Sequence, residues 1–129
     1  MAAGQVVTSY LAPATTSITA VGAASAAVTL TIPAAAAGLF NYLCFLELTA
    51  YATVANVGGV TPVTVTTTGI TGTPAFTLPT AIAVGAIVPY LLTPAVPIKG
   101  SAAATAMTIV APVFTNIIWR ITAYYYVDV

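Results

Sequence analysis

The sequence contains no histidine, and only 3% of its 129 residues are charged, two of them basic and two acidic. Soluble domains ordinarily carry roughly 25% charged residues, so this chain lacks the charged surface that keeps a monomer apart from its neighbours. The deficit predicts one of two environments. Either the chain lies in a lipid bilayer, or other protein subunits cover most of its surface.

The four charged residues are too few for the usual catalytic constellations. Without histidine, a Ser-His-Asp or Cys-His arrangement lacks its base, and a carboxylate pair would have to join Glu47 with Asp128. The sequence has no cluster of histidine, cysteine and carboxylates at metal-ligand spacing. We therefore expect no enzyme activity, no metal and no cofactor.

Nucleic-acid binding is also disfavoured. Such a site needs a basic face to neutralise phosphates, and two basic residues at a formal net charge of zero do not supply one. The run Tyr124-Tyr125-Tyr126 favours core and interface packing over base stacking, because consecutive strand residues point to opposite faces. The single Cys44 allows no disulfide within the chain and is expected to be a small buried apolar residue.

The hydrophobic content leaves a membrane location as an alternative. A spanning helix needs about 20 continuous apolar residues, and the best windows, 34–48 and 81–92, are short or broken by Glu47, Gly85 and Pro89. A membrane barrel would have a polar lumen, whereas the second face of these strands is mostly threonine and alanine. Residues 1–13 carry no basic residue ahead of an apolar stretch and do not resemble a secretory signal. We expect no membrane partner.

The stretch from Asn41 to Thr68 carries the clearest structural signal. Its apolar residues alternate with other residues on both sides of a Gly58-Gly59 turn. A period of two around such a turn predicts two antiparallel strands, because successive strand side chains point to opposite faces.

Similar alternating segments, separated by glycine and proline, recur along the chain. They predict eight strands, at 26–32, 40–55, 61–68, 75–78, 86–93, 95–98, 104–111 and 116–127. Eight short strands with these turn signals predict an all-β fold, a single eight-stranded jelly-roll β-sandwich over residues 26–129. Residues 1–25 are poor in large apolar side chains and are expected to form an extended N-terminal arm, with residues 5–11 as its only strand.

The alternation also divides the strands into two faces. The inward set is predicted to be Val28, Leu30, Ile32, Tyr42, Cys44, Leu46, Leu48, Val63, Val65, Met107, Ile109, Ile117, Trp119 and Ile121. Apolar and aromatic residues left on the other face are what subunit interfaces use. The candidate interface residues are therefore Leu43, Phe45, Glu47, Ile118, Arg120, Tyr124 and Tyr126. A register error of one residue would exchange the two sets.

Glu47 and Arg120 lie in the middle of predicted strands among apolar neighbours. An unpaired buried charge is costly, so three arrangements remain open. The two side chains pair with each other, they pair with groups of a partner chain, or they mark the solvent side of their strands.

Four segments carry a family resemblance: FLELTAYATVANVGGVTPVTVTTTGI (45–70), AIAVGAIVPYLL (81–92), SAAATAMTIVA (101–111) and IIWRITAYYYV (117–127). In their order and composition they resemble small phage virion proteins of the head decoration, or cement, class. The resemblance implies a non-enzymatic jelly roll, often a homotrimer, that binds the major capsid protein on the outer capsid surface of the virion and stabilises the shell.

Two alternatives stay open beside this expectation. One is a jelly-roll module of a phage fibre or spike that binds a host glycan or another virion protein. The other is a β-rich coat protein of a membrane-containing virus. In the decoration interpretation, residues 1–25 would serve as a strap to an adjacent subunit.

Overall fold

The computed structural model describes residues 15–55 and 62–129, which form nine strands and no helix. Two predicted features, the strand at residues 5–11 and the Gly58-Gly59 turn, lie outside the described residues. No helix in the described part of the chain has the length and hydropathy needed to cross a membrane. The strands are β1 (Thr16–Val21), β2 (Val28–Ile32), β3 (Phe40–Ala52), β4 (Val63–Thr68), β5 (Phe76–Leu78), β6 (Ile87–Leu92), β7 (Ile98–Lys99), β8 (Met107–Ala111) and β9 (Ile117–Asp128).

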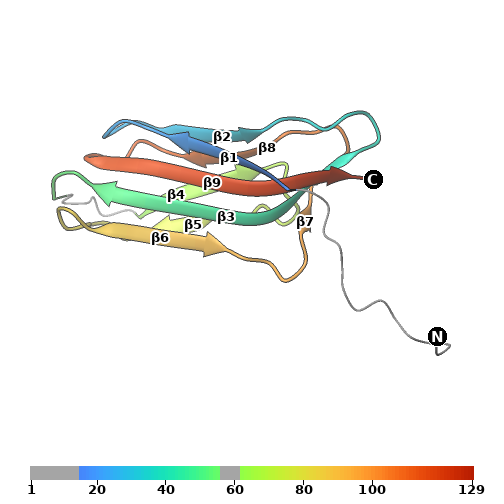
Figure 1. Ribbon diagram of the computed structural model, residues 1–129. Coiled ribbons are helices and arrows are strands. Elements are labelled where there is room, and N and C mark those ends of the chain that lie inside the picture. The colour runs from blue at the N-terminus through green and yellow to red at the C-terminus, as the bar shows by residue number, and fades with distance from the viewer. Residues whose placement is uncertain (1–14, 56–61) are drawn as a thin grey trace, which may run out of the picture.

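The nine strands form two antiparallel sheets that pack face to face (Figure 1). One sheet has five strands in the order β1-β9-β3-β6, with the short β7 also paired to β3. The other has four strands in the order β2-β8-β4-β5. The prediction of an all-β chain is confirmed, and the predicted count of eight strands is wrong.

The strand missing from the prediction is β1, which lies within the segment assigned to the arm. Its residues pair antiparallel with β9, from Thr16 opposite Tyr125 to Val21 opposite Arg120. Ile18 and Ala20 face inward and pack on the core. With so few large apolar residues, β1 has little local signal, and its pairing with β9 is what makes it a strand of the sheet.

The core lies between the two sheets and contains most of the predicted inward set. The burial pattern of β2 alternates strictly, and Trp119 on β9 is completely buried. Its indole Nε1 donates a hydrogen bond to the carbonyl oxygen of Pro112 at 2.8 Å. The predicted inward residues found buried are Val28, Leu30, Ile32, Leu46, Leu48, Val65, Met107, Ile109, Ile117, Trp119 and Ile121.

A β-bulge in β3 overturns the prediction for three residues. The register shifts so that Leu43 pairs with Tyr125 while Phe45 pairs with the adjacent Tyr124, which leaves Cys44 as the extra residue. One extra residue breaks the period of two, and the side chains before it change face relative to those after it. Leu43, predicted for an interface, is therefore fully buried in the core, whereas Tyr42 and Cys44, predicted to be inward, are only half-buried.

Candidate functional site

Six of the seven predicted interface residues project from the outer side of the five-stranded sheet: Phe45, Glu47, Ile118, Arg120, Tyr124 and Tyr126. Their positions on β3 and β9 alternate with core residues such as Leu46 and Trp119, so they point away from the core. We call this outward surface of β1, β9, β3 and β6 the β3/β9 face. The seventh residue, Leu43, points inward because of the bulge.

Pairing between β3 and β9 brings these residues together across the sheet. Phe45 lies opposite Tyr124, and their rings meet edge to face with centroids 5.8 Å apart. One step along, Glu47 lies opposite Thr122, and after it Thr49 lies opposite Arg120. The two longest strands therefore supply the centre of the β3/β9 face, and their pairing, which the alternation did not predict, brings these outward residues together.

Tyr126 lies at one end of the β3/β9 face but is covered by its own chain. Its ring stacks on Tyr42 with a centroid distance of 4.9 Å and an interplanar angle of 3°, and only 9% of the residue is exposed. The Lys99 ammonium lies 3.9 Å from the centroid of the Phe40 ring in the same region. Cation–π and stacking contacts of this kind order the end of the sheet internally. Tyr126 therefore has little surface left for a partner.

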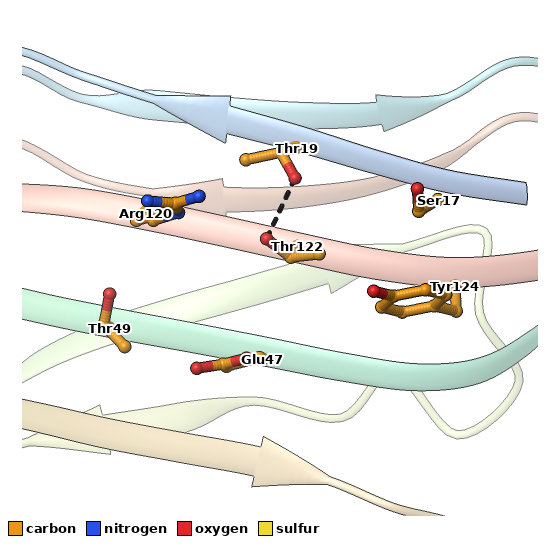
Figure 2. Close-up of a pocket in the computed structure, with 7 residues that line it drawn as sticks. All are labelled: Ser17, Thr19, Glu47, Thr49, Arg120, Thr122 and Tyr124. Atoms are coloured by element: carbon orange, nitrogen blue, oxygen red, sulfur yellow. Dashed lines mark hydrogen bonds between the residues drawn. The ribbon is translucent and has the colours of Figure 1, made fainter.

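A shallow depression of about 430 Å³ occupies the middle of the β3/β9 face (Figure 2). Two of the hydroxyl residues of β1, Ser17 and Thr19, line one side of it, and the hydroxyl groups of Thr19 and Thr122 are hydrogen-bonded at 3.0 Å. These β1 residues were missed by the sequence analysis because β1 itself was not predicted. The lining residues are Ser17, Thr19, Glu47, Thr49, Arg120, Thr122 and Tyr124.

Glu47 and Arg120 both line this depression and are both exposed. They are diagonal neighbours, because Glu47 lies opposite Thr122 and Arg120 lies opposite Thr49. Within the part of the chain that the structure describes, no ion pair joins the two side chains, and Figure 2 draws them separately on neighbouring strands. Of the three arrangements considered from the sequence, pairing within the chain is therefore not the one observed.

Exposed apolar side chains surround the depression. Three of them are cross-strand neighbours of its lining or edge: Val21 lies opposite Arg120, Leu91 opposite Glu47, and Ile87 opposite Tyr51. Scattered exposed apolar residues are normal, but a group on one face indicates an interaction surface. The large apolar residues of this face that are 40% to 60% exposed are Val21, Tyr51, Ile87, Leu91 and Tyr124.

The outer side of the four-stranded sheet has a different character. Its strands carry no charged residue. All four charged residues of the chain lie on strands of the five-stranded sheet. The hydroxyl groups of Thr68 and Thr108, which lie opposite each other on β4 and β8, are hydrogen-bonded. We call this surface the threonine face. Its threonines are Thr29, Thr31, Thr64, Thr66, Thr68, Thr77 and Thr108.

The carboxylates and the thiol can be compared with the catalytic arrangements considered from the sequence. Glu47 is level with Thr122 and Asp128 lies six residues further along β9, which puts the two carboxylates about 20 Å apart at ordinary strand rise. A glycosidase pair needs a separation of roughly 5 to 10 Å. Burial raises the pKa of the Cys44 thiol, which disfavours the reactive thiolate. Among residues 15–55 and 62–129, no group of three or more Cys, Asp and Glu side chains lies together as a metal site.

The β3/β9 face thus combines a central pair of separate opposite charges, threonine hydroxyls and an apolar surround. Such a surface suits non-covalent binding of a broad partner, with polar groups at its centre and apolar area about them. Comparisons of the chain with family models, with curated proteins and with solved structures give no match.

Proposed function

We propose that the chain is a non-enzymatic structural protein of a virus particle, a decoration or cement protein that binds the phage head surface and stabilises the shell through subunit contacts. The observation that carries the proposal is the distribution of charge and apolar area over the two outer faces. The threonine face has no charge, and the β3/β9 face surrounds its two central charges with exposed apolar side chains. Surfaces so poor in charge are stable when neighbouring subunits cover them.

The same proposal takes the sandwich to be a jelly roll. Four antiparallel pairs nest within one another: β1 with β9, β2 with β8, β3 with β6, and β4 with β5. One long hairpin, rolled so that its strands divide between two sheets, produces this nested pairing. The short β7 adds to the β6 side by pairing with β3.

The threonine face is suited to lie against the major capsid protein. Threonine is branched at Cβ and stiff at χ1, so covering it costs little side-chain entropy. No charge has to be desolvated there, since the strands of that sheet carry none. Contacts of standard size, about 1,200 to 2,000 Å² each, reinforce a shell when they repeat around a lattice, without any catalytic residue.

The test is mass spectrometry of virus particles purified on a density gradient from the natural source of the sequence. We expect the chain in the particle band, at a constant ratio to the major capsid protein across the peak. The recombinant chain alone, run on the same gradient, is the control for sedimentation without a shell. Absence of the chain from the particle band would overturn the proposal.

A second candidate is a fibre or spike module that binds a host glycan, and the central depression favours it. The Tyr124 ring, the Glu47 carboxylate, the Arg120 guanidinium and several hydroxyl residues all line the depression, and Figure 2 shows Tyr124 and Arg120 at opposite ends of this group. An aromatic platform beside polar groups in a concave site is suited to a sugar ring. Dose-dependent binding on a glycan array that Tyr124→Ala abolishes would favour this function over the structural one.

A further inference from the structure

We propose that the β3/β9 face is a two-fold contact between two copies of this chain, in which Glu47 of each copy pairs with Arg120 of the other. The inference rests on the proposed function in one respect, since it takes this face as a subunit contact. It goes further by naming the partner and the pairing.

The charges on the face select a second copy over an uncharged partner. Glu47 and Arg120 line the same depression, are exposed, and are not paired with each other. An uncharged partner would remove water from both groups without replacing it, and an uncompensated buried charge is costly. A second copy brings a guanidinium and a carboxylate of its own, one for each unpaired group.

The placement of the two charges fits a two-fold axis. Glu47 and Arg120 are diagonal neighbours on adjacent antiparallel strands, about 7 Å apart at their origins on the sheet. A two-fold axis lying between the facing sheets, through the midpoint of this diagonal and perpendicular to it, carries each charge onto the position opposite the other. The contact is then self-complementary, which is the defining property of a two-fold interface.

The surroundings of the charges complete the contact. The exposed Val21 and Leu91 lie directly opposite Arg120 and Glu47 across the strands, and Tyr51 and Ile87 extend the apolar area. Apolar area around two reciprocal ion pairs supplies both the hydrophobic contribution and the specificity of register. The threonine face has neither exposed large apolar residues nor charges, so it lacks the features of such a contact.

The area of the β3/β9 face indicates how tightly two copies are expected to bind. Its longest strands, β3 and β9, run about 40 Å and four strands span about 15 Å, so a rectangle around the face has a flat area of about 600 Å², which the six-residue strands β1 and β6 fill only in part. A standard interface buries about 800 Å² per partner. We therefore expect a reversible dimer, which a repeating lattice would strengthen. A three-fold assembly, which the family resemblance implies, joins two different patches of each copy. The contact proposed here is two-fold, because one face holds both members of the ion pair.

Sedimentation velocity of the purified recombinant chain over a range of concentrations tests the contact. We expect the natural sequence to show a reversible monomer–dimer equilibrium. Glu47→Arg and Arg120→Glu, each alone, set like charges against each other twice in the dimer, and each is expected to raise the dimer Kd at least about tenfold. Thr77→Arg, on the threonine face, is the matched control and leaves the Kd unchanged.

Mixing the two single variants distinguishes contact between copies from pairing within a chain. In a mixed dimer each arginine of the Glu47→Arg chain meets a glutamate of the Arg120→Glu chain, so an equimolar mixture is expected to restore dimers to within about threefold of the natural Kd. A natural chain that stays monomeric would overturn the contact. So would folded variants whose mixture fails to dimerise, or a trimer that neither substitution affects.

The measurement uses no shell, so its outcome is separate from that of the particle experiment. A monomeric chain that bands with virus particles contradicts the two-fold contact alone. A dimer that is absent from purified particles contradicts the decoration function alone.

Discussion

Two glycines with the same backbone angle φ differ sharply in their surroundings. Gly69 and Gly85 both have φ near +74°, in the left-handed region. A Cβ added at Gly69 would collide with the carbonyl oxygen of Ala106, whereas one added at Gly85 meets nothing within 4 Å. The obstacle at Gly69 is a backbone atom of Ala106, which cannot move aside as the end of a side chain can.

We therefore expect Gly85→Ala to lower the free energy of unfolding by about 1 to 2 kcal/mol, the cost of a left-handed alanine. Gly69→Ala is expected to cost at least about twice as much, because the collision adds to the same backbone penalty. Urea unfolding followed by circular dichroism measures both changes. Equal losses for the two variants would show that the backbone around Gly69 relaxes freely.

Cys44 gives a prediction that depends on pH. Burial raises the pKa of its thiol. The protonated Cys44 thiol therefore contributes its full stabilisation of the fold below the pKa of the unfolded thiol. This contribution is lost as pH rises through the pKa of the folded thiol. The thiolate is the nucleophile, so alkylation by iodoacetamide should reach half its maximal rate at higher pH in the folded chain than in urea. Cys44→Ser is the unlabelled control, and an equal or lower midpoint in the folded chain would contradict the prediction.

At the scale of elements, β1 depends on its inward residues to remain in the sheet. Ile18 is half-buried against the core, whereas its neighbour Ser17 is exposed on the opposite side of the strand. Ile18→Asp would place an unpaired carboxylate against the core, and we expect it to lower the free energy of unfolding by about 2 kcal/mol or more. Ser17→Asp, on the same strand, should change it by less than about 0.5 kcal/mol.

Urea midpoints of the two β1 variants are the measurement. Hydrogen exchange of the β9 amides adds a local probe, because β9 pairs with β1 along one edge and with β3 along the other. Loss of protection confined to the β1 side of β9 is expected for Ile18→Asp. Equal stability of the two variants would mean that β1 adds little to the fold.

The bulge in β3 shows what an alternating pattern leaves undecided within an element. Residues 46 to 52 follow the predicted faces, but Tyr42 and Leu43 are exchanged relative to the prediction. Both are large and apolar, so either assignment satisfies a period of two. The bulge at Cys44 determines that Leu43, and not Tyr42, faces the core. It arises because Leu43 and Phe45 pair with the adjacent residues Tyr125 and Tyr124, which leaves Cys44 as one extra residue.

At the scale of the whole molecule, the two sheets share one core and should unfold together. Trp119 is the only tryptophan, it lies completely buried on the five-stranded sheet, and it packs within the cluster that includes Leu30 and Ile109 of the other sheet. Tryptophan fluorescence and far-ultraviolet circular dichroism should therefore give the same urea midpoint. Separated midpoints would contradict a single cooperative unit. The measurement is best made on dilute chain, where any self-association is least.

The class of fold, the approximate positions of seven strands and most of the core could be predicted from the sequence, whereas the strand expected at 95–98 shares only Ile98 with β7. Those features follow from the period of two, which is a local property of each strand, and from glycine and proline between strands. The sequence also placed Phe45, Glu47, Ile118, Arg120 and Tyr124 on a non-core face, because each alternates with the predicted inward residues of its own strand. The low content of charged residues was also evident from the sequence, because composition can be counted without a structure.

Which residues meet across strands depends on the tertiary structure. The pairing of β1 with β9 brought Ser17 and Thr19 to the depression, and the register of β3 against β9 set Glu47 diagonal to Arg120. The bulge buried Leu43, and stacking on Tyr42 covered Tyr126. These outcomes depend on contacts between segments far apart along the chain, whose energies are summed over the whole sheet. The alternation of side chains within one strand assigns its two faces, but it does not specify which strand will lie beside it.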